Sequence, residues 1–181
     1  MLLEDRVVLV DEGGERTGWA EKSTIHSAST PLHLAFSCYL FDEAGRVLVT
    51  RRALTKRTWP GVWTNSFCGH PGPGEPMTSA IERHARHELG VDIGDIREVL
   101  PDFRYTATDA SGIVENEICP VYVARSRGLI VANPNEVAEW AWIDATDLIA
   151  VVDATPRLVS PWSALQVPLM RAELLAMGGV A

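Results

Sequence analysis

The sequence has few cysteines, no long apolar run and no surplus of positive charge. Its three cysteines, Cys38, Cys68 and Cys119, cannot all pair within one chain, which excludes a disulfide scaffold. The sequence contains no run of about 18 apolar residues, so we expect no membrane span. The acidic start MLLEDR does not resemble a signal peptide. The net charge of −8 argues against a nucleic-acid or anionic-membrane binder. We therefore expect a cytoplasmic protein without membrane insertion or nucleic-acid partners.

What is present fits one globular domain. The chain has 181 residues, of which 46% are hydrophobic and 22% charged, and a chain of this size buries roughly 70% of its unfolded surface. We expect a single domain over residues 1–181, with a core of about residues 20–178 and an N-terminal strand or hairpin over residues 4–18. The mixture of strands and helices indicates an α+β fold with layered α/β/α architecture. We expect a monomer or a weak dimer.

Apolar runs between turn signals predict the strands. They cover residues 6–10, 32–41, 46–52, 91–96, 99–108, 113–124 and 139–143. Residues 19–31 are polar and predicted to be irregular. Residues 55–76 form a long loop rich in Gly, Pro and Trp, and loops of this length in compact domains are often functional.

Three helices are predicted, over residues 78–89, 146–151 and 160 to about 177. For the first, Ser79 and Glu82 fit a capping box and Gly90 fits the left-handed stop. The last begins with the cap residue and proline of Ser160-Pro161 and should kink at Pro168.

Residues 64–90 (TNSFCGHPGPGEPMTSAIERHARHELG) carry the densest chemistry. Cys68 lies two residues before His70 in a Gly/Pro-rich loop. Downstream, Glu115 and Glu117 share one face of a predicted strand, where like charges repel unless a cation lies between them. Solvated acids on an exposed strand are the alternative. For Cys68 the alternative is an incidental surface thiol.

Two further groups allow both a structural and a functional interpretation. Glu88 falls at the edge of the inward face of its helix, so it either pairs with an arginine or binds a metal. His26, His33 and His70 are each more often structural, but with two carboxylates they would suit Mn²⁺, Zn²⁺ or Mg²⁺. A basic cluster is either a solvated face or a clamp for a phosphate or diphosphate; it comprises Lys22, Arg51, Arg52, Lys56 and Arg57.

The same region resembles the 23-residue box of the Nudix superfamily, G-x5-E-x7-R-E-U-x-E-E-x-G-U, where U is aliphatic. The matching positions are Gly69, Glu75, Arg83, Glu88, Gly90 and Val91. His84 and His87 stand where the box has glutamates that bind the metals for diphosphate cleavage. The resemblance therefore implies a Nudix fold, a mixed sheet flanked by helices, without the hydrolytic metal cluster.

A wider set of segments resembles one family of that superfamily, the type I isopentenyl-diphosphate isomerases. They are His26, LHLAFS (32–37), TKRTWPGVWTNSFCGHPGPGE (55–75), ERHARHELG (82–90), FRYTA (103–107), VENEICPVY (114–122) and SPWSA (160–164). The resemblance implies interconversion of isopentenyl and dimethylallyl diphosphate in isoprenoid biosynthesis. The reaction is a metal-dependent 1,3-proton shift through a tertiary carbocation. The substrate is a small-molecule diphosphate.

The resemblance also implies a role for each matching residue. One Mn²⁺, Zn²⁺ or Mg²⁺ would be held by His26, His33, His70, Glu115 and Glu117, and Glu88 would help bind a Mg²⁺ bridging to the diphosphate. Cys68 and Glu117 would be the proton-transfer pair, assisted by Tyr105, with Trp162 against the cation. We favour the Glu117 side as acid and Cys68 as base toward dimethylallyl diphosphate. The phosphate oxygens would be held by Lys22, Arg52, Lys56 and Arg83.

Two other functions remain open from the sequence. One is a Nudix diphosphate hydrolase, against which His84 and His87 count. The other is a catalytically inactive module that binds a metal or a nucleotide. Phosphate release without an allylic product would favour the hydrolase, and metal binding without turnover would favour the inactive module.

Overall fold

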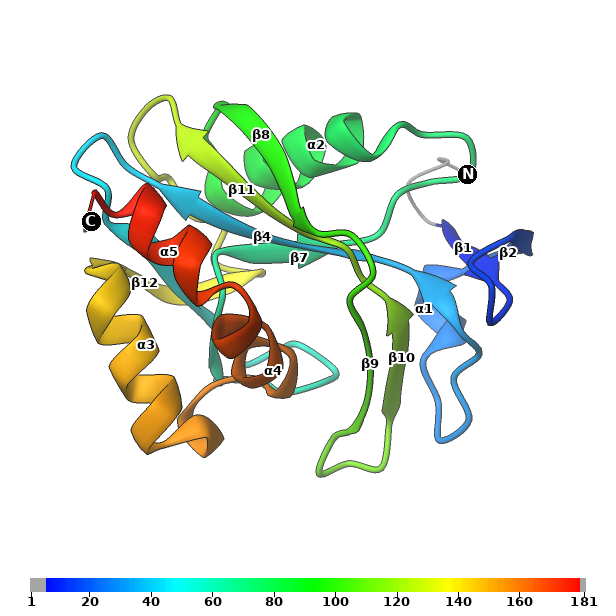
Figure 1. Cartoon of the computed structure of the whole chain (residues 1–181). Coiled ribbons are helices and arrows are strands. Elements are labelled where there is room, and N and C mark those ends of the chain that lie inside the picture. The colour runs from blue at the N-terminus through cyan, green and yellow to red at the C-terminus, as the bar shows by residue number, and fades with distance from the viewer. Residues whose placement is uncertain (1–5, 180–181) are drawn as a thin grey trace.

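A computed structural model of the chain describes residues 6–179. Strands fill the centre of the molecule and helices lie on both sides of them (Figure 1). The strands are β1 (Arg6–Val10), β2 (Arg16–Glu21), β3 (His33–Leu34), β4 (Phe36–Phe41), β5 (Val47–Arg52), β6 (Trp63–Thr64), β7 (Phe67–Gly69), β8 (Ile93–Leu100), β9 (Arg104–Thr108), β10 (Val114–Ile118), β11 (Val121–Ser126) and β12 (Val137–Ile143). The helices are α1 (Lys22–Ile25), α2 (Met77–Leu89), α3 (Ala145–Ala154), the 3-10 helix η2 (Pro156–Leu158), α4 (Pro161–Leu169) and α5 (Arg171–Met177).

The strands form two mixed sheets. The smaller has the order β2-β1-β3-β10-β9, and the larger has the order β12-β5-β4-β11-β8, with β6 paired to β5 and β7 paired to β4. Two pairings are parallel, β3 with β10 and β4 with β11, and the other pairings are antiparallel.

Two segments pass from the smaller sheet into the larger one side by side. The chain leaves β3 at Ala35 to enter β4, and leaves β10 at Cys119-Pro120 to enter β11. Backbone hydrogen bonds hold the two crossings together, from the Ala35 amide to the Ile118 carbonyl (2.9 Å) and from the Ser37 amide to the Pro120 carbonyl (3.1 Å). Residues at the end of each sheet therefore meet at one place.

The larger sheet is covered on both faces, as an α/β/α layered fold requires. Alternate residues of β4 point to opposite faces. Phe36 and Leu40 pack with the α2 residues Ile81 and Leu89. Tyr39 and Phe41 pack in a second core, which includes buried residues of α3, α4 and α5. This confirms the predicted mixed sheet flanked by helices.

The split of two predicted strands follows from these crossings. Residues 32–41 were expected to form one strand but form β3 and β4, and residues 113–124 form β10 and β11. Pro120 cannot donate a ladder hydrogen bond, and it stands where the second segment changes sheets. The predicted loop over residues 55–76 contains β6 and β7, and the predicted irregular segment over residues 19–31 contains the end of β2 and all of α1.

The expected hairpin over residues 4–18 corresponds to the antiparallel pair β1 and β2, which extends to Glu21. Residues 4 and 5 lie outside the described part of the chain. That residues 1–181 form one domain stays a prediction. Within residues 6–179, no helix has both the length and the apolar character needed to cross a bilayer.

The helices lie where the sequence predicts them, but α3 spans Ala145–Ala154 instead of residues 146–151, and α2 starts without the predicted cap. Pro76 occupies the N-cap and no side chain caps the helix, so the capping box of Ser79 and Glu82 is wrong. At the start of α4, Ser160 accepts a hydrogen bond from the Ser163 amide as expected. The last predicted helix divides at Met170 into α4 and α5, two residues after Pro168.

Gly90 ends α2 in the left-handed conformation, with φ 62° and its amide bonded to the Arg86 carbonyl at 3.1 Å. An added Cβ there would lie 2.6 Å from the Val131 backbone oxygen, whereas one at Gly112 (φ 86°) would meet nothing within 4 Å. Both glycines relieve backbone strain, but only Gly90 also allows a close backbone approach.

We expect Gly90→Ala to lower the free energy of unfolding by more than Gly112→Ala does. The control should lose roughly 1–2 kcal/mol from the left-handed backbone alone, and Gly90→Ala should add the displacement of residue 131. Urea unfolding of both variants measures the difference. Equal losses would contradict the predicted contact.

Candidate active site

The predicted site residues gather around one cavity. It has a volume of about 540 Å³ and lies between the smaller sheet, β7, α1, α2, α4 and the loop after β5. It is lined by Lys22, His26, Arg52, Lys56, Cys68, His70, Arg83, Glu88, Tyr105, Glu115, Glu117 and Trp162. Among the predicted residues, His33 is the exception: it is fully buried behind the wall, in contact with His70 and Glu117.

Strand register brings the centre of the site together. Glu117 of β10 lies opposite His33 of β3 on one side and opposite Tyr105 of β9 on the other. His70 comes from the loop after β7, and its Nε2 lies 3.2 Å from Glu117 Oε1 and 3.2 Å from His33 Nε2. Each of four side chains offers one donor atom, and these atoms all lie within 4.8 Å of one another. The four residues are His26, His33, His70 and Glu117.

Glu115 lies beside this donor set, opposite His26. His26 Nε2 faces Glu115 Oε2 at 3.1 Å. Among residues 6–179, both atoms belong to the buried polar atoms that have no hydrogen-bond partner, and so does His70 Nδ1. Because an unpartnered buried polar group is costly, the facing atoms of His26 and Glu115 favour an additional charged group beside them.

The ionisation states of Glu117 and His70 suit a cation, whereas that of His33 follows its contact with Glu117. Burial lowers the pKa of His70 to about 3, so this imidazole is neutral at pH 7. Burial opposes ionisation of Glu117, but hydrogen bonds to His33 and His70 hold its pKa well below the ordinary value. Burial also disfavours charge on His33, yet its contact with Glu117 raises its pKa. The carboxylate and the neutral imidazole are the forms that ligate metals.

The residues therefore fit a divalent metal ion. Three imidazole nitrogens with a carboxylate form a donor set typical of divalent metal sites. His33 Nδ1 also bonds the Pro31 carbonyl at 2.9 Å, which leaves Nε2 directed at the cluster. Such an outer contact is typical of metal-binding histidines.

Cys68 lies beside β4, opposite Ser37 in the strand register. Its sulfur contacts Ser37 Oγ at 3.3 Å and donates to Asn65 Oδ1 at 3.2 Å. Burial raises the pKa of Cys68 to about 12, so at neutral pH the thiol holds its proton. The thiol is therefore a partly buried group facing the cavity, unlike an incidental surface cysteine.

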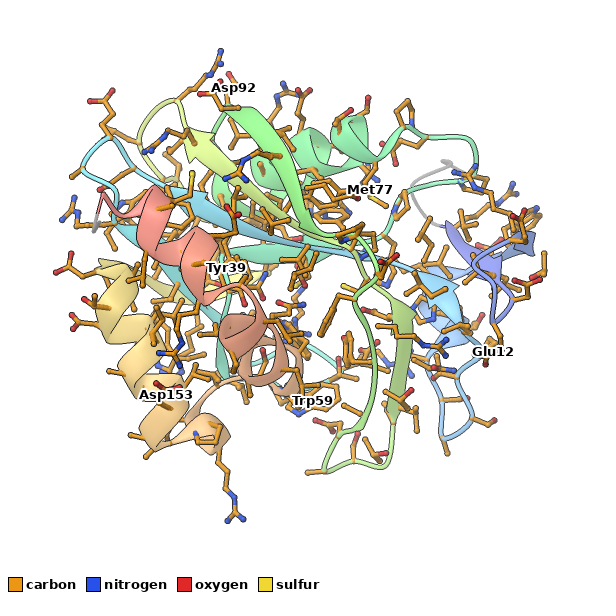
Figure 2. The ribbon with its side chains drawn as sticks, viewed as in Figure 1. Glu12, Tyr39, Trp59, Met77, Asp92 and Asp153 are labelled. Carbon is orange, nitrogen blue, oxygen red and sulfur yellow. The ribbon has the colours of Figure 1, made fainter. Side chains whose placement is uncertain are left out.

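Tyr105 and Trp162 form an aromatic wall of the cavity. Their ring centroids are 5.9 Å apart. The rings of Trp162 and Trp59 form a T-shaped pair with centroids 5.4 Å apart. Figure 2 shows Trp59 beside α4. Burial raises the pKa of Tyr105 well above its ordinary value, so this hydroxyl keeps its proton. Arg52 lies over the Trp162 ring, with Cζ 5.4 Å from the centroid.

Glu88 is buried, and its partner is a histidine. His84 Nδ1 and Glu88 Oε1 are 2.9 Å apart, one helical turn from each other on α2. The alternative of a pairing with arginine is thus wrong. Burial disfavours charge on Glu88, but the hydrogen bond to His84 lowers its pKa. His84 also requires Gly69, because an added Cβ there would lie 2.5 Å from the imidazole.

The basic residues reach the cavity with other partners in place. Arg52 donates through Nε and Nη2 to the Thr58 carbonyl at 3.1 and 2.9 Å. Lys56 pairs with Glu136. Arg83 donates to both carboxylate oxygens of Glu75, at 2.9 and 2.8 Å. Lys22 is exposed on α1 at the cavity.

Several contributors were missed by sequence reasoning. Thr58 donates to Glu115 Oε1 at 2.9 Å, so it links the donor set to the Arg52 contact. Glu136 lines the cavity, as does Arg57 of the predicted basic cluster. Arg51 instead bonds Gly61 and Glu139.

Asn65 contacts both Cys68 and Trp162. Neither the spacing nor the chemistry of these residues marks them in the sequence, because their partners are distant along the chain.

Comparison with known proteins identifies the family. The NUDIX domain family matches residues 31–163. The chain is 55% identical over 175 residues to "Isopentenyl-diphosphate Delta-isomerase" of Clavibacter michiganensis subsp. michiganensis, covering 97% of this chain and 90% of that protein. It is 56% identical over 174 residues to the protein of the same name from Paenarthrobacter aurescens, covering 96% and 95%.

Solved structures agree on the fold. DR0079 from Deinococcus radiodurans has a TM-score of 0.68 and 22% identity, covering 90% of this chain and 97% of that chain. A MutT protein from Methanosarcina mazei Go1 has a TM-score of 0.61 and 17% identity, covering 79% and 95%. At this identity the likeness concerns the fold alone.

The low pKa of His70 predicts an acid-sensitive metal-free protein. The unfolded chain protonates this imidazole near pH 6.5 but the folded chain only near pH 3, so acid favours unfolding between these values. Between pH 6.5 and pH 4.5, where Glu117 ordinarily begins to titrate, this group should lower the free energy of unfolding by up to about 1.4 kcal/mol per pH unit.

His70→Gln should have a flatter stability profile over the same range. Denaturant unfolding in the presence of a chelator, at several pH values, compares the variant with the wild type. Parallel profiles would refute the assignment of a depressed pKa to His70.

Proposed function

The chain belongs to the isopentenyl-diphosphate Delta-isomerases of the NUDIX family, and from this membership we propose how its cavity moves a proton along a five-carbon diphosphate. A proton is added to the terminal alkene carbon of isopentenyl diphosphate, which leaves a tertiary carbocation. Loss of a proton from the neighbouring methylene then forms the allylic double bond of dimethylallyl diphosphate. Atoms and charge balance without a redox partner.

One observation carries this proposal. A thiol, Cys68, and a carboxylate, Glu117, line the same cavity together with a group of basic side chains. A proton shift needs a group that gives a proton and a group that takes one near the same short chain. The basic side chains provide a counter-charge for a diphosphate.

We propose that His26, His33, His70, Glu115 and Glu117 hold one divalent cation. Buried atoms without partners on His26 and Glu115, which face each other at 3.1 Å, support this assignment. A bound cation supplies positive charge that stabilises the ionised carboxylates and orients them. Glu88, at the cavity on α2, is proposed to help hold a Mg²⁺ that bridges to the diphosphate.

Cys68 and Glu117 are the proposed proton-transfer pair, and Tyr105 assists on the Glu117 side. The thiol carries its proton at neutral pH, whereas Glu117 is ionised. The sequence-based choice of the Glu117 side as acid toward dimethylallyl diphosphate stays a prediction. It requires a proton to pass from sulfur to the side of Glu117 and Tyr105 before the alkene reacts.

Trp162 is proposed to stabilise the carbocation. Its indole is almost fully buried at 3% exposure, and a desolvated cation–π contact contributes about 2 kcal/mol or more, roughly 30-fold in rate. Together with Tyr105, the ring also keeps water from the cation, which would otherwise be captured as an alcohol.

The diphosphate is proposed to bind Lys22, Arg52, Lys56 and Arg83. Lys56 pairs with Glu136 and Arg83 with Glu75, so these two side chains would share their charge between an acid and the substrate. Arg52 instead donates its hydrogen bonds to a backbone carbonyl. Because a carbonyl is uncharged, this contact does not neutralise the positive charge of Arg52.

Incubating the protein with isopentenyl diphosphate and Mg²⁺ tests the proposed function. We expect dimethylallyl diphosphate without release of phosphate, because His84 and His87 replace two acids of the hydrolytic box. Proton NMR follows the allylic product, and a phosphate assay runs on the same sample. Phosphate release with no allylic product would reject the isomerase in favour of the hydrolase.

Cys68→Ala should lower the turnover rate by about 10²–10⁴-fold, the usual effect of losing an acid–base group. Cys38→Ala is the matched control, because this fully buried cysteine packs on the opposite face of β4, in the core beside α2, and has no proposed role. It should retain a rate near that of the wild type. Near-normal turnover by Cys68→Ala would rule out the role given to the thiol.

A further inference from the structure

Asn65 lies in the turn between β6 and β7, three residues before Cys68, and is fully buried. Its amide nitrogen donates to two backbone carbonyls, Cys38 at 3.0 Å and Phe67 at 2.7 Å. Reversing the amide would place its oxygen against both carbonyl oxygens. The side chain therefore has one orientation, with Oδ1 turned away from the carbonyl groups of Cys38 and Phe67.

That oxygen accepts hydrogen bonds from two residues of the proposed proton-shift chemistry. Cys68 donates from its sulfur at 3.2 Å and Trp162 donates from Nε1 at 2.9 Å. Thr64 Oγ1 donates to the same oxygen at 2.8 Å. One atom thus joins the thiol on β7 to the indole on α4.

The start of α4 is tied to the same turn by other contacts. Ser160 Oγ lies 2.7 Å from Thr64 Oγ1, and the Ser160 amide donates to the Trp63 carbonyl at 2.8 Å. These bonds fix the backbone of the helix start. The Trp162 ring, however, is held by its own hydrogen bond to Asn65 as well as by packing against Trp59 and Tyr105.

We propose that Asn65 is a positioning residue that fixes the Cys68 thiol and the Trp162 ring relative to each other. This inference rests on the proposed function, because it assumes that both groups act on one substrate. Its consequence is geometric. If the shared acceptor is lost, the thiol and the indole can rotate independently, and a displacement of about 1 Å can lower a rate by about 10²-fold.

A purely structural role is the rival explanation, since any buried asparagine with two backbone acceptors supports a fold. Ser66 provides the matched control. It is adjacent and fully buried, and its hydroxyl donates to the Leu48 carbonyl and accepts from the Leu40 amide, both at 2.7 Å. It has no hydrogen bond to Cys68 or Trp162 among residues 6–179.

The test compares Asn65→Ala with Ser66→Ala by steady-state kinetics and by ¹H–¹⁵N NMR of the tryptophan indoles, with the Trp162 signal assigned by Trp162→Phe. We expect Asn65→Ala to lower kcat roughly 10- to 100-fold with little change in KM, because the basic groups are untouched. Its Trp162 indole signal should also shift. Ser66→Ala should keep both kcat and that signal, even if it is less stable.

The inference is overturned if both variants show the same kcat and the same Trp162 signal. If Asn65→Ala does not fold, the wild type still decides, because a hydrogen-bonded Trp162 indole should exchange slowly in D₂O and rapid exchange would refute the contact. Absence of turnover in the wild type would reject the proposed function instead. The indole signals would then still report whether Asn65 holds Trp162.

Discussion

Four donor groups that converge in the protein interior, with Glu115 facing one of them, set the main constraint on this structure. His33, His70 and Glu117 bond one another, but His26 and Glu115 face each other without a hydrogen bond. Buried carboxylates are unfavourable unless they are paired with positive charge. The proposed divalent cation would provide that charge beside Glu117 and Glu115.

The fold meets this constraint through the paired crossing of two segments between the sheets. Because the chain crosses at Ala35 and again at Pro120, the ends of β3 and β10 lie beside the start of β4. His33 and Glu117 belong to the smaller sheet, while Cys68 pairs with the larger one. The crossing therefore brings a carboxylate cluster and a thiol to a single cavity. The helix α4 adds the aromatic wall, and Asn65 links that wall to the thiol.

Local signals predicted those parts of the structure that depend on neighbouring residues. Gly90 ends α2 because its backbone is left-handed. Ser160 caps α4 by accepting a hydrogen bond from the amide of Ser163, three residues later. The motif spacing, read through the family resemblance, also named the residues of the cavity. The capping box at Ser79 failed because Pro76 begins the helix.

Contacts between distant segments were beyond such signals. Nothing local indicates that Thr58 reaches Glu115 or that Asn65 joins β7 to α4. The division of residues 113–124 between two sheets also depends on the pairing of β10 with β3 and of β11 with β4. Each of these follows from tertiary packing, which a single sequence does not specify residue by residue.

Calorimetric titration of the metal-free protein with Mn²⁺, without any diphosphate present, tests the central claim most directly. We expect one ion to bind per chain in the wild type, with affinity weakened severalfold or more in Glu115→Gln and unchanged in Glu139→Gln, an exposed acid that pairs with Arg51 on β5. Failure of the wild type to bind an ion, or equal affinity in the wild type and Glu115→Gln, would contradict the account.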